Sequence, residues 1–124
     1  MPLHVYDLIV TTDTNGDGTK QTVDPIKGLW YGYKWMDGDL ADGVDAVLSV
    51  PAQGFSPART LLTLTDANAD VNPTLLRQAT VTAPGTPSTD DYDYPVIDGD
   101  LLLTVNDGGS AKTGGLSVYV FEDS

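Results

Sequence analysis

The chain predicts an all-β fold, a single antiparallel β-sandwich or barrel of about eight short strands. Its strand-like runs are short and rich in the β-branched and aromatic residues that favour strands. Clusters of Asp, Gly, Asn and Pro separate these runs at regular spacing, as in sandwiches and barrels. No apolar stripe at helical spacing extends beyond about two turns. A length of 124 residues fits one domain, residues 1–124, with a short N-terminal arm of about residues 1–6.

The first half of the chain alternates strand patterns with turn signals. VYDLIVTT is β-branched and aromatic, and the DTNGDG that follows it is a strong turn signal. A short return strand then stops before Pro25, and DGDLADG forms the next loop. The segment after that loop alternates apolar and polar residues, as a half-buried strand does. The expected strands are residues 5–12, 19–24, 26–36 and 44–50.

Residues 26–36 (IKGLWYGYKWM) form the aromatic centre of the chain. A strand period of two places Leu29, Tyr31, Tyr33 and Trp35 on one face, and Trp30, Gly32, Lys34 and Met36 on the other. We expect these aromatic side chains to fill the core, because a small sandwich needs large side chains inside. A sugar-stacking platform is the alternative interpretation. If both faces are aromatic, one of them also meets a neighbouring subunit.

The second half of the chain continues the same pattern. The expected strands are residues 59–65, 95–97, 101–105 and 116–121. Residues 74–83 fit a short helix or a strand, and the threonines near the end of this segment favour a strand. Residues 84–94 are polar and contain proline, which predicts a loop. The last two strands are expected to pair as a hairpin across a glycine-rich turn.

The residue inventory argues against catalysis. The chain has no Cys, a single His (His4), a single Glu (Glu122), and six Lys plus Arg against 18 Asp plus Glu. Acid–base and nucleophilic catalysis usually recruit His, Cys, Lys or a tuned pair of carboxylates, so we expect no enzyme. The net charge of −12 repels phosphate backbones and anionic lipid, which makes nucleic acid and membranes poor partners. The N-terminal segment has no basic, apolar signal pattern, so synthesis in a cytoplasm is expected.

The sharpest local motif is DTNGDGTKQTVD, residues 13–24. Asp13, Asn15, Asp17 and Asp24 match positions 1, 3, 5 and 12 of a calcium loop, with glycine at position 6. Calcium prefers several hard oxygen ligands that converge from one short loop. The motif resembles the loops of dockerin modules, although Lys20 stands where an apolar residue is expected. The alternative is an Asx/Gly turn that binds no cation.

Four stretches together resemble the small structural proteins of tailed bacteriophages. These stretches are IVTTDTNGDGT, KGLWYGYKWMDGDLADGVDAVLSV, RTLLTLTDAN and YPVIDGDLLLTVNDGGSAKTGGLSVYVFED, and the likeness in layout extends over nearly the whole chain. The likeness is to capsid decoration, or cement, proteins. It implies a β-sandwich that binds the outside of a shell of major capsid protein, commonly as homotrimers near local three-fold axes. It implies a virion location on the capsid surface and no catalytic residues.

On this interpretation the N-terminal arm and exposed aromatic residues make the contacts to the lattice or within a trimer. The candidate interface residues are Leu3, His4, Trp30, Tyr33 and Trp35. Two other interpretations stay open at the level of sequence. One is a different virion component, such as a head-completion, tail or fibre-base protein. The other is a calcium-dependent carbohydrate-binding module.

Overall fold

The computed structural model describes residues 2–53, 55, 57–70, 74–75, 78–83, 86–93 and 96–122, with the backbone alone between 74 and 93. All regular structure in this part of the chain is β-strand, which confirms the all-β class. The strands are β1 (Leu3–Thr11), β2 (Gly18–Gln21), β3 (Ile26–Met36), β4 (Asp45–Val50), β5 (Arg59–Leu64), β6 (Thr74–Leu75), β7 (Gln78–Ala83), β8 (Thr86–Asp93), β9 (Val96–Gly99), β10 (Leu102–Asn106) and β11 (Thr113–Phe121).

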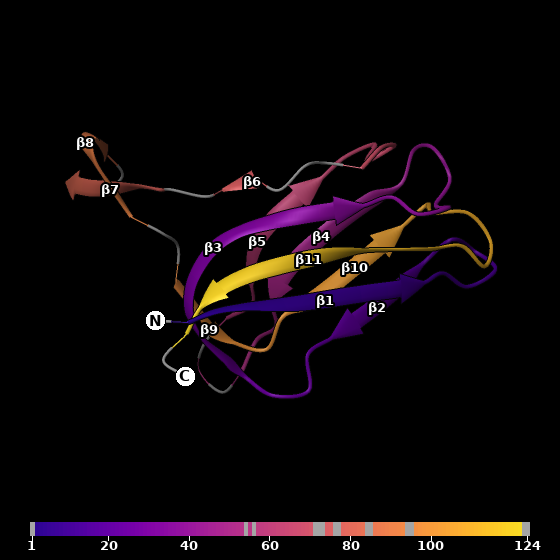
Figure 1. Ribbon diagram of the computed structural model, residues 1–124, viewed down its shortest axis with the longest axis horizontal. Coiled ribbons are helices and arrows are strands. Elements are labelled where there is room, and N and C mark those ends of the chain that lie inside the picture. Colours follow the sequence, from indigo (N-terminus) through magenta and orange to yellow (C-terminus); the bar gives the residue numbers. More distant parts are fainter. Residues whose placement is uncertain are drawn as a thin grey trace.

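Two antiparallel sheets form the body of the molecule (Figure 1). The five-stranded sheet has the order β1-β11-β3-β6, with β9 also paired to β3. The four-stranded sheet has the order β2-β10-β4-β5, and β7 pairs with β8 in a separate ribbon. The strand pairs described are antiparallel, as expected for a sandwich or barrel built from short connections.

The core lies between the inner faces of the two sheets. Alternate residues of the central strands supply it, because successive side chains of a strand point to opposite faces. Leu116, Val118 and Val120 of β11 are fully buried, and they oppose Leu103 and Val105 of β10 from the other sheet. Burial of this apolar surface is the main favourable term in folding. Trp35, Leu48, Ile97 and Leu101 are also fully or almost fully buried.

A β-bulge in β3 corrects the sequence-based assignment of its two faces. Tyr119 pairs with Gly32, whereas Val120 pairs with Trp30, so Tyr31 is an extra residue on β3. The extra residue reverses the alternation at this point. Trp30 and Trp35 therefore both face the core, at 3% and 0% exposure, although strict alternation assigns them to opposite faces.

The predicted hairpin between the last two strands is wrong. β10 lies in the four-stranded sheet, between β2 and β4, and β11 lies in the five-stranded sheet, between β1 and β3. Both strands are apolar on their inner face, and they bury it by facing each other across the core rather than by pairing. The glycine-rich loop after β10 therefore crosses from one sheet to the other. The loop between β1 and β2 makes the same kind of crossing.

Three smaller expectations also change. Leu3 to Tyr6 belong to β1 and pair with β11, so the expected N-terminal arm is part of the sheet from Leu3 onwards. Residues 86–93 form strand β8 where a loop was expected, because backbone pairing with β7 does not need apolar side chains. Strands β6 and β7 confirm the strand alternative for 74–75 and 78–83, and residues 76–77 lie outside the described part.

Candidate functional site

The outer face of the five-stranded sheet carries an apolar row that crosses four strands. Leu3 of β1 pairs with Phe121 of β11, Phe121 pairs with Leu29 of β3, and Leu29 pairs with Val96 of β9. Residues in such register share one face of a sheet and lie side by side. Leu3 is 48% exposed and Val96 is 54% exposed, so both ends of the row are open to solvent. We call Leu3, Phe121, Leu29 and Val96 the apolar row.

Further apolar side chains extend this face along β1. Val5 pairs with Tyr119, and both residues lie next to the apolar row. The Val5 side chain is 53% exposed. The bulged Tyr31 contacts Phe121 edge-on, with ring centroids 4.7 Å apart. Ile9, which is 46% exposed, lies further along β1. Asp7, Ser117 and Lys34 form one polar row in between, in which the Ser117 hydroxyl donates to Asp7 Oδ1 at 2.5 Å.

The outer face of the four-stranded sheet is different in kind. Register places Thr104 of β10 between Thr19 of β2 and Val47 of β4, and Val47 pairs with Thr63 of β5. Leu102 pairs with Gln21 on one side and with Ser49 on the other. Threonine, serine and amide side chains therefore interrupt the few apolar residues of that face. This asymmetry marks the five-stranded sheet as the surface suited to dry contact with another molecule.

The predicted interface residues divide between this face and the core. Leu3 lies in the apolar row and is exposed. Trp30 and Trp35 are core residues, and both indole N–H groups donate to backbone carbonyls, Trp30 to Gly32 at 2.9 Å and Trp35 to Ala67 at 3.1 Å. The expectation that these two tryptophans fill the core is confirmed, and their assignment as interface residues is wrong. Neither offers a surface for stacking a sugar. Tyr33 is partly buried and packs on Trp30.

His4 belongs to a small polar cluster at the end of β1. Its Nε2 lies 3.8 Å from Glu122 Oε2, and the Tyr6 hydroxyl donates to Glu122 Oε1 at 2.6 Å. Burial, the hydrogen bond to Glu122 and the charge of that carboxylate raise the pKa of Tyr6 to about 12. The Glu122 backbone N–H also donates to the Pro2 carbonyl at 3.1 Å. The cluster therefore fastens β1 to the segment that follows β11.

Loops rich in aspartate meet at one end of the sandwich, and their side chains bind backbone amides. Asp13 Oδ1 accepts from the N–H groups of Asn15 and Asp17, at 2.8 and 3.1 Å. Four further side chains bridge between loops, each accepting one backbone N–H: Asp39 from Thr113, Asp45 from Asp66, Asn68 from Gly43, and Asp70 from Asp37. These contacts give the aspartates a structural role, because loop backbone groups need partners.

Asp37 is the member of this group whose titration is perturbed. Burial, followed by the charges of Asp70 and Asp42, raises the pKa of Asp37 above its usual range. Its own backbone N–H is bound to Asp70 Oδ1 at 2.7 Å. The raised pKa of Asp37 thus follows first from burial of its carboxyl and then from two neighbouring carboxylates, in a loop that is held in place by hydrogen bonds.

The four predicted calcium ligands do not come together. Asp13, Asn15 and Asp17 lie in the turn before β2, and Asp24 follows the far end of β2, which runs as an extended strand from Gly18 to Gln21. A strand rises about 3.3 Å per residue, so β2 separates Asp24 from the turn. Among the residues that the structure describes, no group of three or more His, Asp or Glu side chains is arranged to hold a metal ion.

Most of the apolar face does not follow from the sequence patterns. Val5, Ile9, Val96 and Phe121 lie within segments whose apolar residues were assigned to strands without a choice of face, and Leu29 was assigned to the same face as the buried Trp35. The signal for this face is present in β1, where the odd positions carry Leu3, Val5 and Ile9 and the even positions carry Tyr6, Leu8 and Val10. A strand with apolar residues at both odd and even positions has two apolar faces, so either both are buried in the protein or one is exposed and can bind another molecule.

No family model, curated protein or solved structure matches this chain. Within the described residues, the structure contains no helix of the length and apolar character that a membrane span requires.

Proposed function

We propose that this protein is a non-enzymatic structural protein of a virion, which binds the outside of an assembled capsid lattice and stabilises it. The observation that carries the proposal is the apolar row, exposed on the outer face of one sheet while the other sheet presents a threonine-rich face. A decoration protein needs one adhesive face and one face that tolerates water. The proposed partners are the major capsid protein and further copies of this chain, as a homotrimer.

The charge of the chain supports this proposal. At a net charge of −12, free copies repel one another and stay soluble in spite of an exposed apolar face. The same charge orients the protein towards a basic surface before short-range contacts form. On a symmetric lattice each copy repeats one interface, so modest contacts combine into strong attachment. The resemblance of the sequence to cement proteins of tailed bacteriophages agrees with this role.

The hydrogen bonds of the described polar side chains also agree with a binding role. The aspartates at the loop-rich end bind backbone amides, and the Tyr6 hydroxyl donates to Glu122. These side chains therefore stabilise the fold through hydrogen bonds. The proposed binding role does not require them to act as catalytic groups.

Sedimentation with capsids tests the proposal. Purified protein is mixed with emptied capsids of its source particle, in calcium and in EDTA, and the bound copies are counted. We expect saturable binding at many copies per capsid, equal in both buffers. Binding of a few copies per capsid would favour a head-completion or tail component, and no binding by the folded protein would contradict the proposal.

A further inference from the structure

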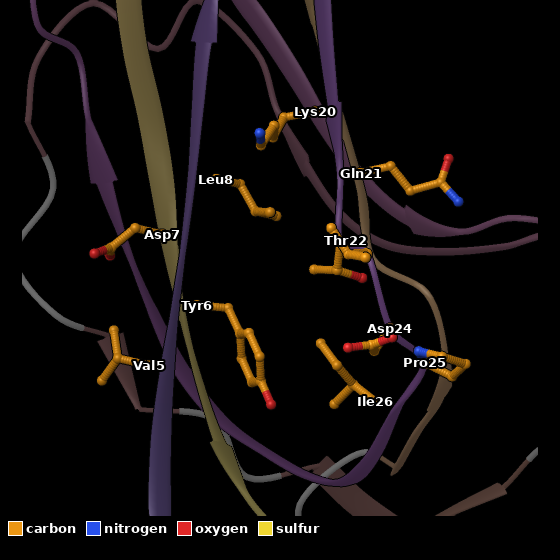
Figure 2. Close-up of a pocket in the computed structure, with 11 residues that line it drawn as sticks. Val5, Tyr6, Asp7, Leu8, Lys20, Gln21, Thr22, Asp24, Pro25 and Ile26 are labelled. Atoms are coloured by element: carbon orange, nitrogen blue, oxygen red, sulfur yellow. The ribbon is translucent and has the colours of Figure 1, made fainter.

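A groove runs along the side of the sandwich between β1 and the chain that follows β2. It has a volume of about 410 Å³ and is lined by Val5–Leu8 of β1 and by residues 20–26. Figure 2 shows Tyr6 and Leu8 pointing from β1 into this space, towards Thr22 and Ile26. The side chains of Val5 and Asp7 point the other way, so these two residues line the groove with their backbone. We call this space the β1 groove.

The hydrogen bonds of β1 show which of its backbone groups face the groove. At the two ends of the β1–β11 ladder, the Thr12 N–H donates to the Lys112 carbonyl at 2.8 Å, and the Glu122 N–H donates to Pro2 at 3.1 Å. In an antiparallel ladder the bonded positions alternate. Even-numbered residues of β1 therefore bond to β11, and odd-numbered residues turn their N–H and carbonyl groups to the opposite edge.

That opposite edge of β1 forms no ladder with a strand of the described residues. Among the described residues, β11 is the one strand that pairs with β1. β2 comes close at one end, where a Cβ on Gly18 would lie 2.5 Å from Val10 Cγ1, and then diverges. Thr22 is held on the far wall by Leu101: its N–H donates to the Leu101 carbonyl at 2.9 Å, and its hydroxyl accepts from the Leu101 N–H at 3.0 Å.

We propose that the β1 groove binds an extended, basic segment of a partner protein, which adds to β1 as a further strand. The N–H and carbonyl groups of Val5 and Asp7 pair with no strand of the described part of the chain, and they are the template for such pairing. Alternate side chains of the added strand would pack on Tyr6 and Thr22, which are partly exposed and line the groove above the buried Leu8 and Ile26. This inference concerns the edge of the sheet and does not rest on the proposed docking of its outer face.

The charge of the whole chain favours one kind of extended segment. The Asp7 carboxylate points away from the groove and accepts from Ser117, so the charged side chains left along the groove are Asp24 and Lys20, one of each sign. A segment that carries lysine or arginine between apolar residues complements the net charge of −12. A second copy of the same chain would bring a further charge of −12 to the contact, which disfavours pairing of β1 with β1.

Proline at an odd position of β1 provides a selective test. Asp7→Pro removes an N–H that faces the groove and leaves the bonds to β11 in place, as edge strands tolerate. Asp7→Ala is the matched control, because both variants lose the bond between Ser117 and the carboxylate. The probe is a fluorescent peptide of alternating lysine and valine, and binding is followed by anisotropy.

We expect saturable binding to the wild type and to Asp7→Ala, and binding roughly tenfold weaker to Asp7→Pro. In the wild type, the peptide should slow hydrogen exchange at the Val5 and Asp7 amides, a readout that does not depend on how well the proline variant folds. Absence of saturable binding, unchanged exchange at both amides, or equal affinity of the two variants would overturn the proposal. Self-association of the protein alone that Asp7→Pro abolishes would assign the edge to a second copy and contradict a basic partner.

Discussion

At the scale of single residues, the side chains of four aspartates act as acceptors for backbone amides: Asp13, Asp39, Asp45 and Asp70. The sequence motif DTNGDG correctly indicates a turn, and Asp13 makes that turn by binding the N–H groups of Asn15 and Asp17. A pattern of alternating Asp and Asn is shared by cation loops and Asx turns, so the motif alone does not separate the two. The course of β2, which carries Asp24 away, makes the difference.

Replacing Asp13 with alanine tests the turn role. Asp13→Ala should lower the free energy of unfolding by about 1 kcal/mol, because two backbone N–H groups lose a charged acceptor. Asn15→Ala is the control and should change it by less than about 0.5 kcal/mol. Urea unfolding measures both. If calcium raises the melting temperature of the wild type and both variants lose that response, the turn is a cation site instead.

Tyr6 makes the stability of the protein depend on alkaline pH. The pKa of a tyrosine in an unfolded chain is 10.0, and the pKa of Tyr6 in the folded protein is about 12. Between these values the unfolded chain has lost the phenolic proton that the folded protein keeps. The stability from the protonated hydroxyl is therefore complete below pH 10 and is lost as the pH rises towards 12.

The Tyr6→Phe variant should show a shallower fall in the free energy of unfolding between pH 10 and 12 than the wild type. Urea titrations across this pH range measure the slope. Tyr119→Phe, on the outer face of β11, serves as the control and should retain the slope of the wild type. An unchanged slope in Tyr6→Phe would show that the bond between Tyr6 and Glu122 does not control this transition.

At the scale of elements, strands were easier to predict than their partners. Period-two alternation and turn residues locate β1, β3, β4, β5 and β11, because these signals depend on neighbours in the sequence. The pairing of β10 with β2 and β4 depends on which sheet buries it, a property of the whole core. The bulge at Tyr31 likewise cannot be recognised from the alternation of residues in IKGLWYGYKWM. Because of this bulge, both tryptophans point into the core.

Two positions require glycine for different reasons, Gly28 because neighbouring atoms are close and Gly43 because its φ is positive. A Cβ on Gly28 of β3 would overlap the Phe121 carbonyl oxygen and lie 2.8 Å from Val120 Cγ1. Gly43 has a φ of +89°, and a Cβ at this position would have no atom within 4 Å. Gly28→Ala should therefore cost about 3 kcal/mol, through displacement of β3 from β11. Gly43→Ala should cost about 1 kcal/mol, through backbone strain alone.

Thermal or urea unfolding of the two alanine variants tests this ranking. Equal losses of stability would mean that β3 and β11 adapt to the extra methyl group without cost. In that case the register between these two strands, which also aligns the apolar row, would be less rigid than the contacts at Gly28 indicate.

At the scale of the whole molecule, the two outer faces differ in chemistry, and the proposed function depends on that difference. Composition predicts an acidic module, and the proposed capsid binding requires an adhesive surface, but neither places that surface. Its location depends on cross-strand register, which aligns residues from positions 3, 29, 96 and 121. Sequence patterns do not contain such long-range alignment, and therefore Leu3 is the single member of the apolar row that the sequence analysis identified.

The central claim is that the apolar row is the docking surface, and one binding comparison tests it most directly. Val96→Lys places a charge in the row, and Thr63→Lys places the same charge on the exposed outer face of the four-stranded sheet. Both sites are on the surface, so the stability of each variant should stay within about 0.5 kcal/mol of the wild type. Co-sedimentation with emptied capsids should be lost for Val96→Lys and retained for Thr63→Lys. Equal binding of the two variants would contradict the claim.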